Sequence, residues 1–124
     1  MKRAKDYNIL SKIYRKNITH VQTNGNEIQM FMDGKINDPE VKNIHEVTYD
    51  IKIWVSEKGY YLVSGKSETD EQAFEAWFVD DFERKVKYYH KDDQKLDARE
   101  MAFWDDTEYE AVMKAAKWLY KKEK

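Results

Sequence analysis

The chain has 124 residues, of which 41% are hydrophobic, 15% aromatic and 37% charged, and its formal net charge is −2. This length is typical of one compact domain, and folding such a chain buries roughly two-thirds of its surface, which is enough for a core without disulfides. The absence of cysteine excludes a disulfide framework, a thiolate zinc site, an iron–sulfur cluster and a cysteine nucleophile. We therefore expect a single domain over residues 1–124.

Apolar stretches are short throughout the chain. No uncharged run approaches the ~20 apolar residues that a membrane-spanning helix needs. The chain opens on basic residues, but residues 7–16 contain charged and polar side chains where a signal peptide would be apolar. We therefore expect a cytoplasmic protein that makes no contact with a membrane.

The first predicted element is a short helix over residues 6–16. Its apolar residues Ile9, Leu10, Ile13 and Tyr14 recur at spacings of three and four, which places them on one face. The opposite face is basic, because six of the first 16 residues are Lys or Arg and one is acidic.

A hairpin is predicted next, over residues 18–32. Asn24-Gly25 lies between two segments that can form strands, and these two residues tolerate the positive φ angles that a tight primed turn requires. Residues 35–43, which include Pro39, are predicted to be a polar connection.

The middle of the chain is predicted to consist of strands. Residues 46–55 alternate, with apolar side chains on one face, and therefore favour a strand with one buried side; these side chains are Val47, Tyr49, Ile51, Ile53 and Val55. A turn at Glu57-Lys58-Gly59 then leads into a strand over residues 60–64.

Residues 73–79 contain aromatic residues at helical spacing, but their composition favours a strand. We predict a hairpin in which this strand pairs with residues 86–90 around a turn at residues 80–84.

The C-terminal residues return to helical periodicity. Tyr109, Val112, Met113 and Ala116 lie on one face, and Thr107 with Glu110 has the spacing of a capping box. The expected fold is therefore α+β: an antiparallel meander of five to six strands flanked by an N-terminal and a C-terminal helix, in two layers.

Catalytic and cofactor motifs are absent from the sequence. There is no glycine-rich phosphate loop, no Gly-x-Ser-x-Gly elbow and no pair of histidines at metal-ligating spacing. The paired aspartates lie in predicted loops or at a helix start, where carboxylates usually serve as surface charge or caps. We therefore expect a protein that is not an enzyme and that holds no cofactor or metal.

Charge is sorted along the chain. Residues 67–110 carry 15 acidic and 6 basic side chains, whereas residues 1–66 and 111–124 have net charges of +3 and +4. Internal complementarity between these segments is the simplest explanation.

The acidic segment is also interleaved with aromatic residues. Its charges could attract a partner, and its aromatic side chains could be buried in the interface with that partner. This combination favours a protein-binding module, most simply a small inhibitor or immunity-type protein that occludes the basic channel of a nucleic-acid-binding enzyme. Lys outnumbers Arg 18 to 4, as in an AT-rich genome, and a phage or mobile-element origin would fit this type. The proposed partner-binding residues are Asp70, Glu71, Trp77, Asp80, Asp81, Glu83, Tyr89, Asp92, Asp93 and Asp97.

Two alternatives stay open. Basic terminal helices and outward aromatics would suit single-stranded nucleic acid, through Lys2, Arg3, Lys5, Lys12 and Trp54. A small-ligand pocket between helices and sheet is the other, although the sequence provides no polar constellation that defines a ligand.

Overall fold

The computed structural model describes residues 4–67, 73–79 and 102–122 of the chain. The elements in these ranges are α1 (Asp6–Tyr14), β1 (Ile18–Asn24), β2 (Glu27–Met32), β3 (Glu40–Asn43), α2 (Ile44–Ser56), β4 (Tyr61–Lys66), β5 (Phe74–Val79), β6 (Phe103–Asp105) and α4 (Glu108–Lys122). None of the described helices has both the length and the apolar character required to cross a bilayer.

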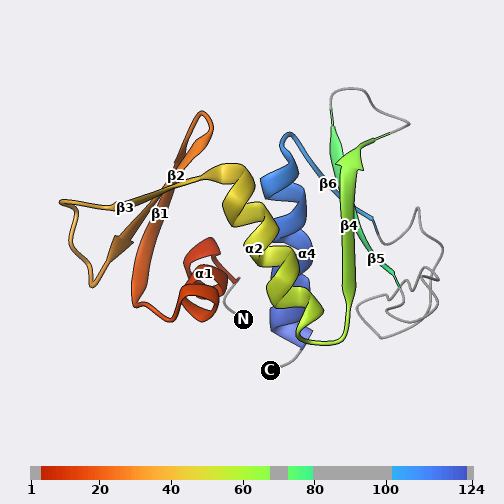
Figure 1. Ribbon diagram of the computed structural model, residues 1–124, viewed down its shortest axis with the longest axis horizontal. Helices are drawn as coiled ribbons and strands as arrows, with labels where there is room; N and C mark the ends of the chain where they lie inside the picture. The colour runs from red at the N-terminus through yellow and green to blue at the C-terminus, as the bar shows by residue number, and fades with distance from the viewer. Residues whose placement is uncertain (1–3, 68–72, 80–101, 123–124) are drawn as a thin grey trace.

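The described strands form two antiparallel sheets, ordered β1-β2-β3 and β4-β5-β6, and the helices lie between them (Figure 1). The α+β class is therefore confirmed. The expected single meander of five to six strands is wrong. The helix α2 lies between β3 and β4 in the chain, and β4 belongs to a second sheet. The helices are a middle layer with a sheet on each side, so the expected two-layer arrangement is also wrong.

The expected strand over residues 46–55 is a helix. Val47, Ile51 and Val55 are fully buried, and their spacing of four suits a helix as well as a strand. A strand with one buried face would also bury the two residues between them, Tyr49 and Ile53. These side chains are 64% and 41% exposed, as a helix requires. The Asn43 side chain accepts a hydrogen bond from the His45 backbone N–H at 2.8 Å and caps the helix.

The predicted hairpin over residues 18–32 is confirmed, with its turn displaced by one residue. Asn24 pairs with Glu27, so Gly25 and Asn26 are the central residues, and only Gly25 has a positive φ, 61°. This is the arrangement of a type II′ turn, in which glycine takes the first central position. The connection predicted over residues 35–43 contains a strand that was not expected, β3, which pairs with β2.

The second sheet contains the predicted strand at residues 60–64 as β4 and the predicted strand at 73–79 as β5. The expected partner of β5, residues 86–90, and the turn at residues 80–84 lie outside the described residues. β5 pairs with β4 on one side and with β6 on the other, with Trp77 opposite Val63 and Glu75 opposite Trp104.

The terminal helices are confirmed as α1 and α4. In α4 the Thr107 hydroxyl accepts a hydrogen bond from the Glu110 backbone N–H at 3.1 Å, which is half of the predicted capping box. One continuous core joins both sheets to the three helices. Its fully buried members come from α1, β2, α2, β5 and α4 and include Ile9, Leu10, Ile28, Met30, Val47, Ile51, Val55, Ala76, Val112, Ala116 and Leu119.

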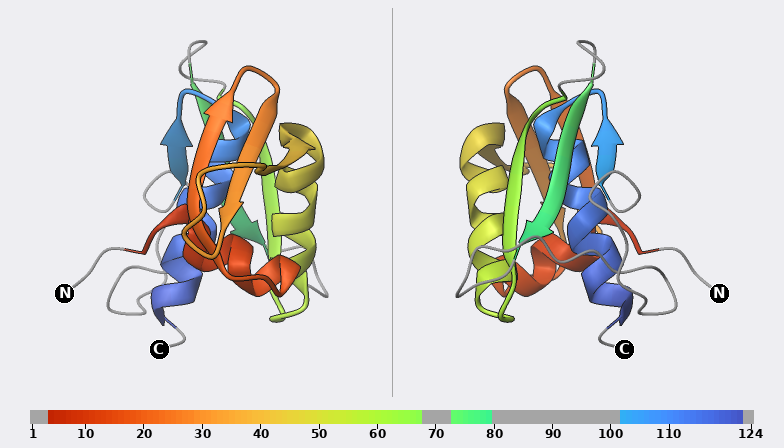
Figure 2. Two further views of the ribbon diagram at one scale, coloured as in Figure 1. Left: turned by 90° about the vertical axis from the view of Figure 1, so that its left-hand side faces the viewer. Right: turned by 90° about the vertical axis from the view of Figure 1, so that its right-hand side faces the viewer.

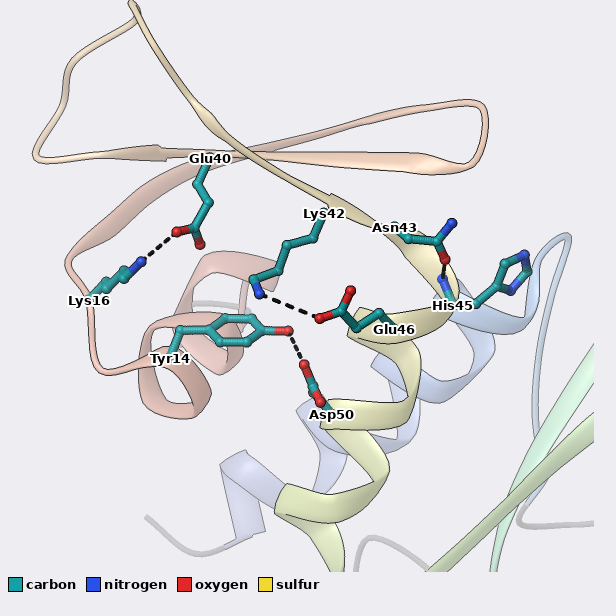
Figure 3. A network of polar contacts seen from close by, with 8 residues as sticks. All are labelled: Tyr14, Lys16, Glu40, Lys42, Asn43, His45, Glu46 and Asp50. Carbon is teal, nitrogen blue, oxygen red and sulfur yellow. Dashed lines mark hydrogen bonds and ion pairs between the residues drawn. The ribbon is translucent and has the colours of Figure 1, made fainter.

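Tyr14 fastens the end of α1 to the rest of the molecule (Figure 3). Its hydroxyl donates a hydrogen bond to Asp50 of α2 at 2.7 Å, and the Lys42 ammonium of β3 lies 5.0 Å from the centre of its ring. Lys42 also approaches Glu46 at 3.7 Å. These contacts join α1 to β3 and α2, two consecutive elements that lie further along the chain.

The helices α2 and α4 lie side by side and run in the same direction (Figures 1 and 2). Both begin at the end of the molecule where the β1-β2 turn lies, and both end near the C-terminal mark in Figure 1. Parallel helices align their dipoles, so their N-terminal ends form one partly positive pole and their C-terminal ends one partly negative pole.

Candidate protein-binding site at one end of the molecule

Of the ten predicted partner-binding residues, the structure describes Trp77. The other nine lie outside the described residues: Asp70, Glu71, Asp80, Asp81, Glu83, Tyr89, Asp92, Asp93 and Asp97. Trp77 is half-buried on β5. The part of the acidic segment (residues 67–110) that the structure describes is residues 67, 73–79 and 102–110.

That part contains five carboxylates, and they gather in one place. Glu75 lies near the start of β5, Asp105 ends β6, and three more carboxylates lie in the turn before α4 and in its first turn. The antiparallel register brings these segments together, because Phe74 pairs with Asp105 and Glu75 with Trp104. We call these five residues the acidic end: Glu75, Asp105, Asp106, Glu108 and Glu110.

Two tryptophans accompany the acidic end. Trp104 is 38% exposed, and its indole Nε1 donates a hydrogen bond to Glu75 Oε2 at 3.0 Å. Trp77 lies two residues from Glu75 and so shares its face of the sheet. The alternate residues Ala76 and Phe78 are buried, on the face that packs against α4. The outer face of β5 and β6 therefore combines two indole rings with the carboxylate of Glu75.

The start of α4 holds its carboxylates in fixed positions. The Asp105 side chain accepts a hydrogen bond from the Asp106 backbone N–H at 2.7 Å, and Glu108 Oε2 accepts one from the Ser64 hydroxyl at 2.9 Å. The positive pole of the helix dipole stabilises negative charge here. A local structural reason thus exists for several acids at this position.

A groove of about 290 Å³ lies beside the acidic end, between β1 and α4. Its walls include Val21 and Met113, and Tyr109 donates a hydrogen bond to Asp6 at 2.8 Å. Lys117 pairs with Asp6 at 2.5 Å. Two carboxylates of the acidic end, Asp105 and Glu110, complete the lining together with Thr23 and Lys114.

The two carboxyls of the acidic end that line this groove differ in proton affinity. Burial alone would raise the pKa of Asp105, but hydrogen bonds from the Asp106 backbone N–H and from Lys114 outweigh it and lower that pKa. A hydrogen bond to Asp105, burial and the charges of Asp105, Asp106 and Asp6 together raise the pKa of the Glu110 carboxyl. The folded chain therefore holds Glu110 in a place where its negative charge is unfavourable.

Lysines neutralise the acidic end only in part. Lys114 lies 3.0 Å from Asp105 and also donates to the Trp104 carbonyl at 2.7 Å. Among the described residues, this is the one ion pair that any of the five carboxylates makes. The chemistry of the site is that of an anionic, aromatic-lined surface suited to cationic groups. Within the described ranges, no group of three or more potential ligand side chains is arranged to hold a metal ion.

Of the described residues of the nucleic-acid alternative, the structure brings Lys12 and Trp54 to one groove and leaves Lys5 outside it. Lys2 and Arg3 lie outside the described residues, and Lys5 and Lys12 are exposed on or beside α1. Trp54 lies on α2 and not on a sheet, is 9% exposed, and has the Lys58 ammonium 4.8 Å from the centre of its ring.

The sequence indicates only local roles, at a helix start, for three residues of the acidic end. Asp105 and Asp106 are adjacent acids at a predicted helix start, and Glu110 is half of a capping box. Their proximity to Glu75 follows from β6, a strand of three residues that no sequence pattern marks. The alternation within β5 was the one available signal, because it places Glu75 and Trp77 on the same face.

Comparisons of the chain with models of protein families, with curated proteins and with solved structures found no match.

Proposed function

We propose that the protein is a non-catalytic protein-binding module that presents its acidic end and the neighbouring tryptophans to a basic surface on its partner. Its form of action would be inhibition, in which the carboxylates occupy the place of phosphates on a nucleic-acid-binding enzyme. The single observation that carries the proposal is the presence of five carboxylates at the end of the molecule where the Trp104 ring is exposed and bonded to Glu75, with one lysine ion pair among them in the described residues.

The two components of this surface have different physical roles. Carboxylates at one end of a small protein attract a basic partner over a distance of about one Debye length. They raise the association rate more than the affinity. A partly exposed tryptophan supplies apolar area and is enriched among the residues that dominate binding energy. Trp104 is positioned for this role by its hydrogen bond to Glu75 and by the contact of its carbonyl with Lys114.

The raised pKa of Glu110 gives separate support. A carboxylate that is unfavourable in the isolated protein costs stability, and a cationic partner group placed against Asp105 and Glu110 would offset that repulsion. Groups with shifted pKa values are enriched at functional sites.

The experiment first identifies the partner and then tests the surface. The immobilised protein is exposed to an extract of the cells in which it occurs, the retained proteins are identified, and the strongest binder is purified. Association of that partner is then measured for the wild type, for Asp106→Lys with Glu110→Lys, and for Trp104→Ala. We expect the double charge reversal to slow association about tenfold at low salt, and Trp104→Ala to speed dissociation.

The matched control reverses two exposed carboxylates elsewhere, Glu46→Lys on α2 with Glu57→Lys at the residue that follows α2, and should alter association less than about twofold. Equal association rates for the two double variants would refute the proposal. Salt-sensitive binding of a single-stranded oligonucleotide, lost on replacing Lys2, Arg3, Lys5 and Lys12, would instead establish the nucleic-acid alternative.

A further inference from the structure

A second groove lies at the opposite end of the helical layer, between the end of α1 and the second half of α2. Its volume is about 480 Å³. Three cationic side chains line it, Lys12, Arg15 and Lys58, together with the carboxylates Asp50 and Glu57. The lining thus carries one more positive than negative charge, whereas the groove beside the acidic end carries one more negative than positive charge.

Two of the three cations, Lys12 and Arg15, are available to a ligand. Lys12 and Arg15 are exposed, and neither makes an ion pair with a described residue. By contrast, the neighbouring Lys16 pairs with Glu40 at 2.5 Å (Figure 3). Of the two carboxylates, Asp50 already accepts the Tyr14 hydroxyl hydrogen bond, as Figure 3 shows.

An apolar surface accompanies the cations. Ile13 and Trp54 line the groove, and the Ile53 side chain, which is 41% exposed, forms part of its wall. Tyr49 lies one helical turn before Ile53 on α2 and is 64% exposed. Four apolar or aromatic side chains thus lie in or next to the groove that contains Lys12 and Arg15.

We propose that this groove docks an acidic peptide segment of a protein partner, which places an apolar side chain on the exposed Ile53, next to Trp54, and carboxylates on Lys12 and Arg15. The choice of occupant follows from charge complementarity with the groove's cations. A nucleic acid fits less well, because Asp50 and Glu57 face a continuous phosphate chain and because the Trp54 ring is buried and therefore closed to base stacking.

This docking site is independent of the acidic end, since the two grooves share no residue. The probe is a synthetic acidic peptide of alternating glutamate and leucine, titrated into the full-length isotope-labelled protein and followed by amide and indole NMR shifts. We expect the largest shifts at Arg15, Ile53 and the Trp54 indole. Replacing the glutamates with glutamine, or the leucines with serine, should abolish or strongly weaken binding.

Two matched double variants locate the site. Lys12→Gln with Arg15→Gln should weaken peptide binding roughly tenfold at low salt, as expected for the loss of two exposed ion pairs. Lys5→Gln with Lys35→Gln removes the same charge from exposed positions outside the groove and should change binding less than about twofold. Ile53→Ser, at an exposed position, should weaken binding at every salt concentration.

Three results would overturn the inference: no shifts with the wild type, equal losses in the two double variants, or displacement of the peptide by a single-stranded oligothymidylate that binds more tightly. None of these results depends on the acidic end. Failure here would therefore leave the proposed function as it stands.

Discussion

Tyr14 makes the hydrogen bond on which the position of α1 depends most directly. The half-buried ring lies between α1 and α2, and its hydroxyl is 2.7 Å from Asp50. Tyr14→Phe removes the donor and leaves Asp50 unpaired, so we expect unfolding free energy to fall by about 1 to 2 kcal/mol. Urea denaturation of the wild type and the variant measures this change in unfolding free energy. Tyr49→Phe, on an exposed tyrosine of α2, is the control and should leave the midpoint unchanged; equal effects of the two substitutions would contradict this role for Tyr14.

Two tyrosines make stability depend on alkaline pH. Burial, reinforced by Asp50 for Tyr14 and by Asp6 for Tyr109, raises the pKa of both phenols above the ordinary 10.0. The folded state therefore keeps two protons that the unfolded chain loses, and stability falls as pH rises above about 10. Urea midpoints at about pH 9 and pH 11 should show this decline, and Tyr14→Phe with Tyr109→Phe should reduce its steepness.

The negative charge of Glu110 is expected to lower the stability of the folded protein. Its pKa is raised in the folded state, so its contribution to stability is favourable at low pH and is lost as pH rises through that pKa. Glu110→Gln keeps a hydrogen-bonding group near Asp105 without the charge. We expect it to raise the melting temperature at neutral pH and to leave it unchanged in acid, where the wild-type carboxyl is protonated. A lower melting temperature at neutral pH would show that the negative charge of Glu110 is favourable.

At the scale of elements, α2 shows where sequence patterns stop being decisive. Val47, Ile51 and Val55 recur every four residues, a spacing compatible with both a strand and a helix, so the prediction depended on Tyr49 and Ile53 alone. These two residues are exposed because α2 turns them away from the sheets. Both terminal helices were predictable, because their apolar stripes are long enough to exclude alternation.

A pair of substitutions separates the helix from the expected strand. In the alternation, Ile51 and Ile53 are equivalent, but in α2 Ile51 is fully buried and Ile53 is 41% exposed. Ile51→Ala should therefore cost about 2–5 kcal/mol and Ile53→Ala less than about 1 kcal/mol. Chemical denaturation measures both, and similar costs would favour the strand.

Pairing between strands was less accessible to sequence analysis than the strands themselves. The Asn24-Gly25 signal located one hairpin, since its partners are adjacent in the chain. β3 and β6 have four and three residues, too few for a period to be visible, and β6 is separated from β5 by residues 80–102. The acidic end depends on that distant pairing, so its members were recognised as charges but not as neighbours.

At the scale of the whole molecule, the two sheets share one core through the helices between them. Ile28 and Met30 from one sheet and Leu62 and Phe78 from the other belong to the same buried cluster. We therefore expect the sheets to unfold together. Far-ultraviolet circular dichroism and tryptophan fluorescence should give coincident urea transitions, and the calorimetric and van't Hoff enthalpies should agree. Separate transitions would mean that each sheet forms a unit of its own.

The charge distribution also belongs to the whole molecule. The described residues carry 13 basic and 13 acidic side chains, so their net charge is zero. In α4, Glu108 in the first turn and Lys121 and Lys122 in the last turn complement the helix dipole, whereas the charge of Glu110 is disfavoured by its acidic neighbours. Part of the sorting seen in the sequence therefore has a structural explanation, and binding through the acidic end would use one charge, that of Glu108, that also stabilises the helix.

The opposite charges at the two ends of α4 have a consequence for the orientation of the protein in solution. With acids at the head of α4 and lysines at its foot, the described part of the protein behaves as a permanent electric dipole even though its charges sum to zero. A nearby charged body exerts a torque on such a dipole and turns it before the two touch. An electropositive surface would thus meet the tryptophan-bearing end first, and raised ionic strength would make that approach random in orientation.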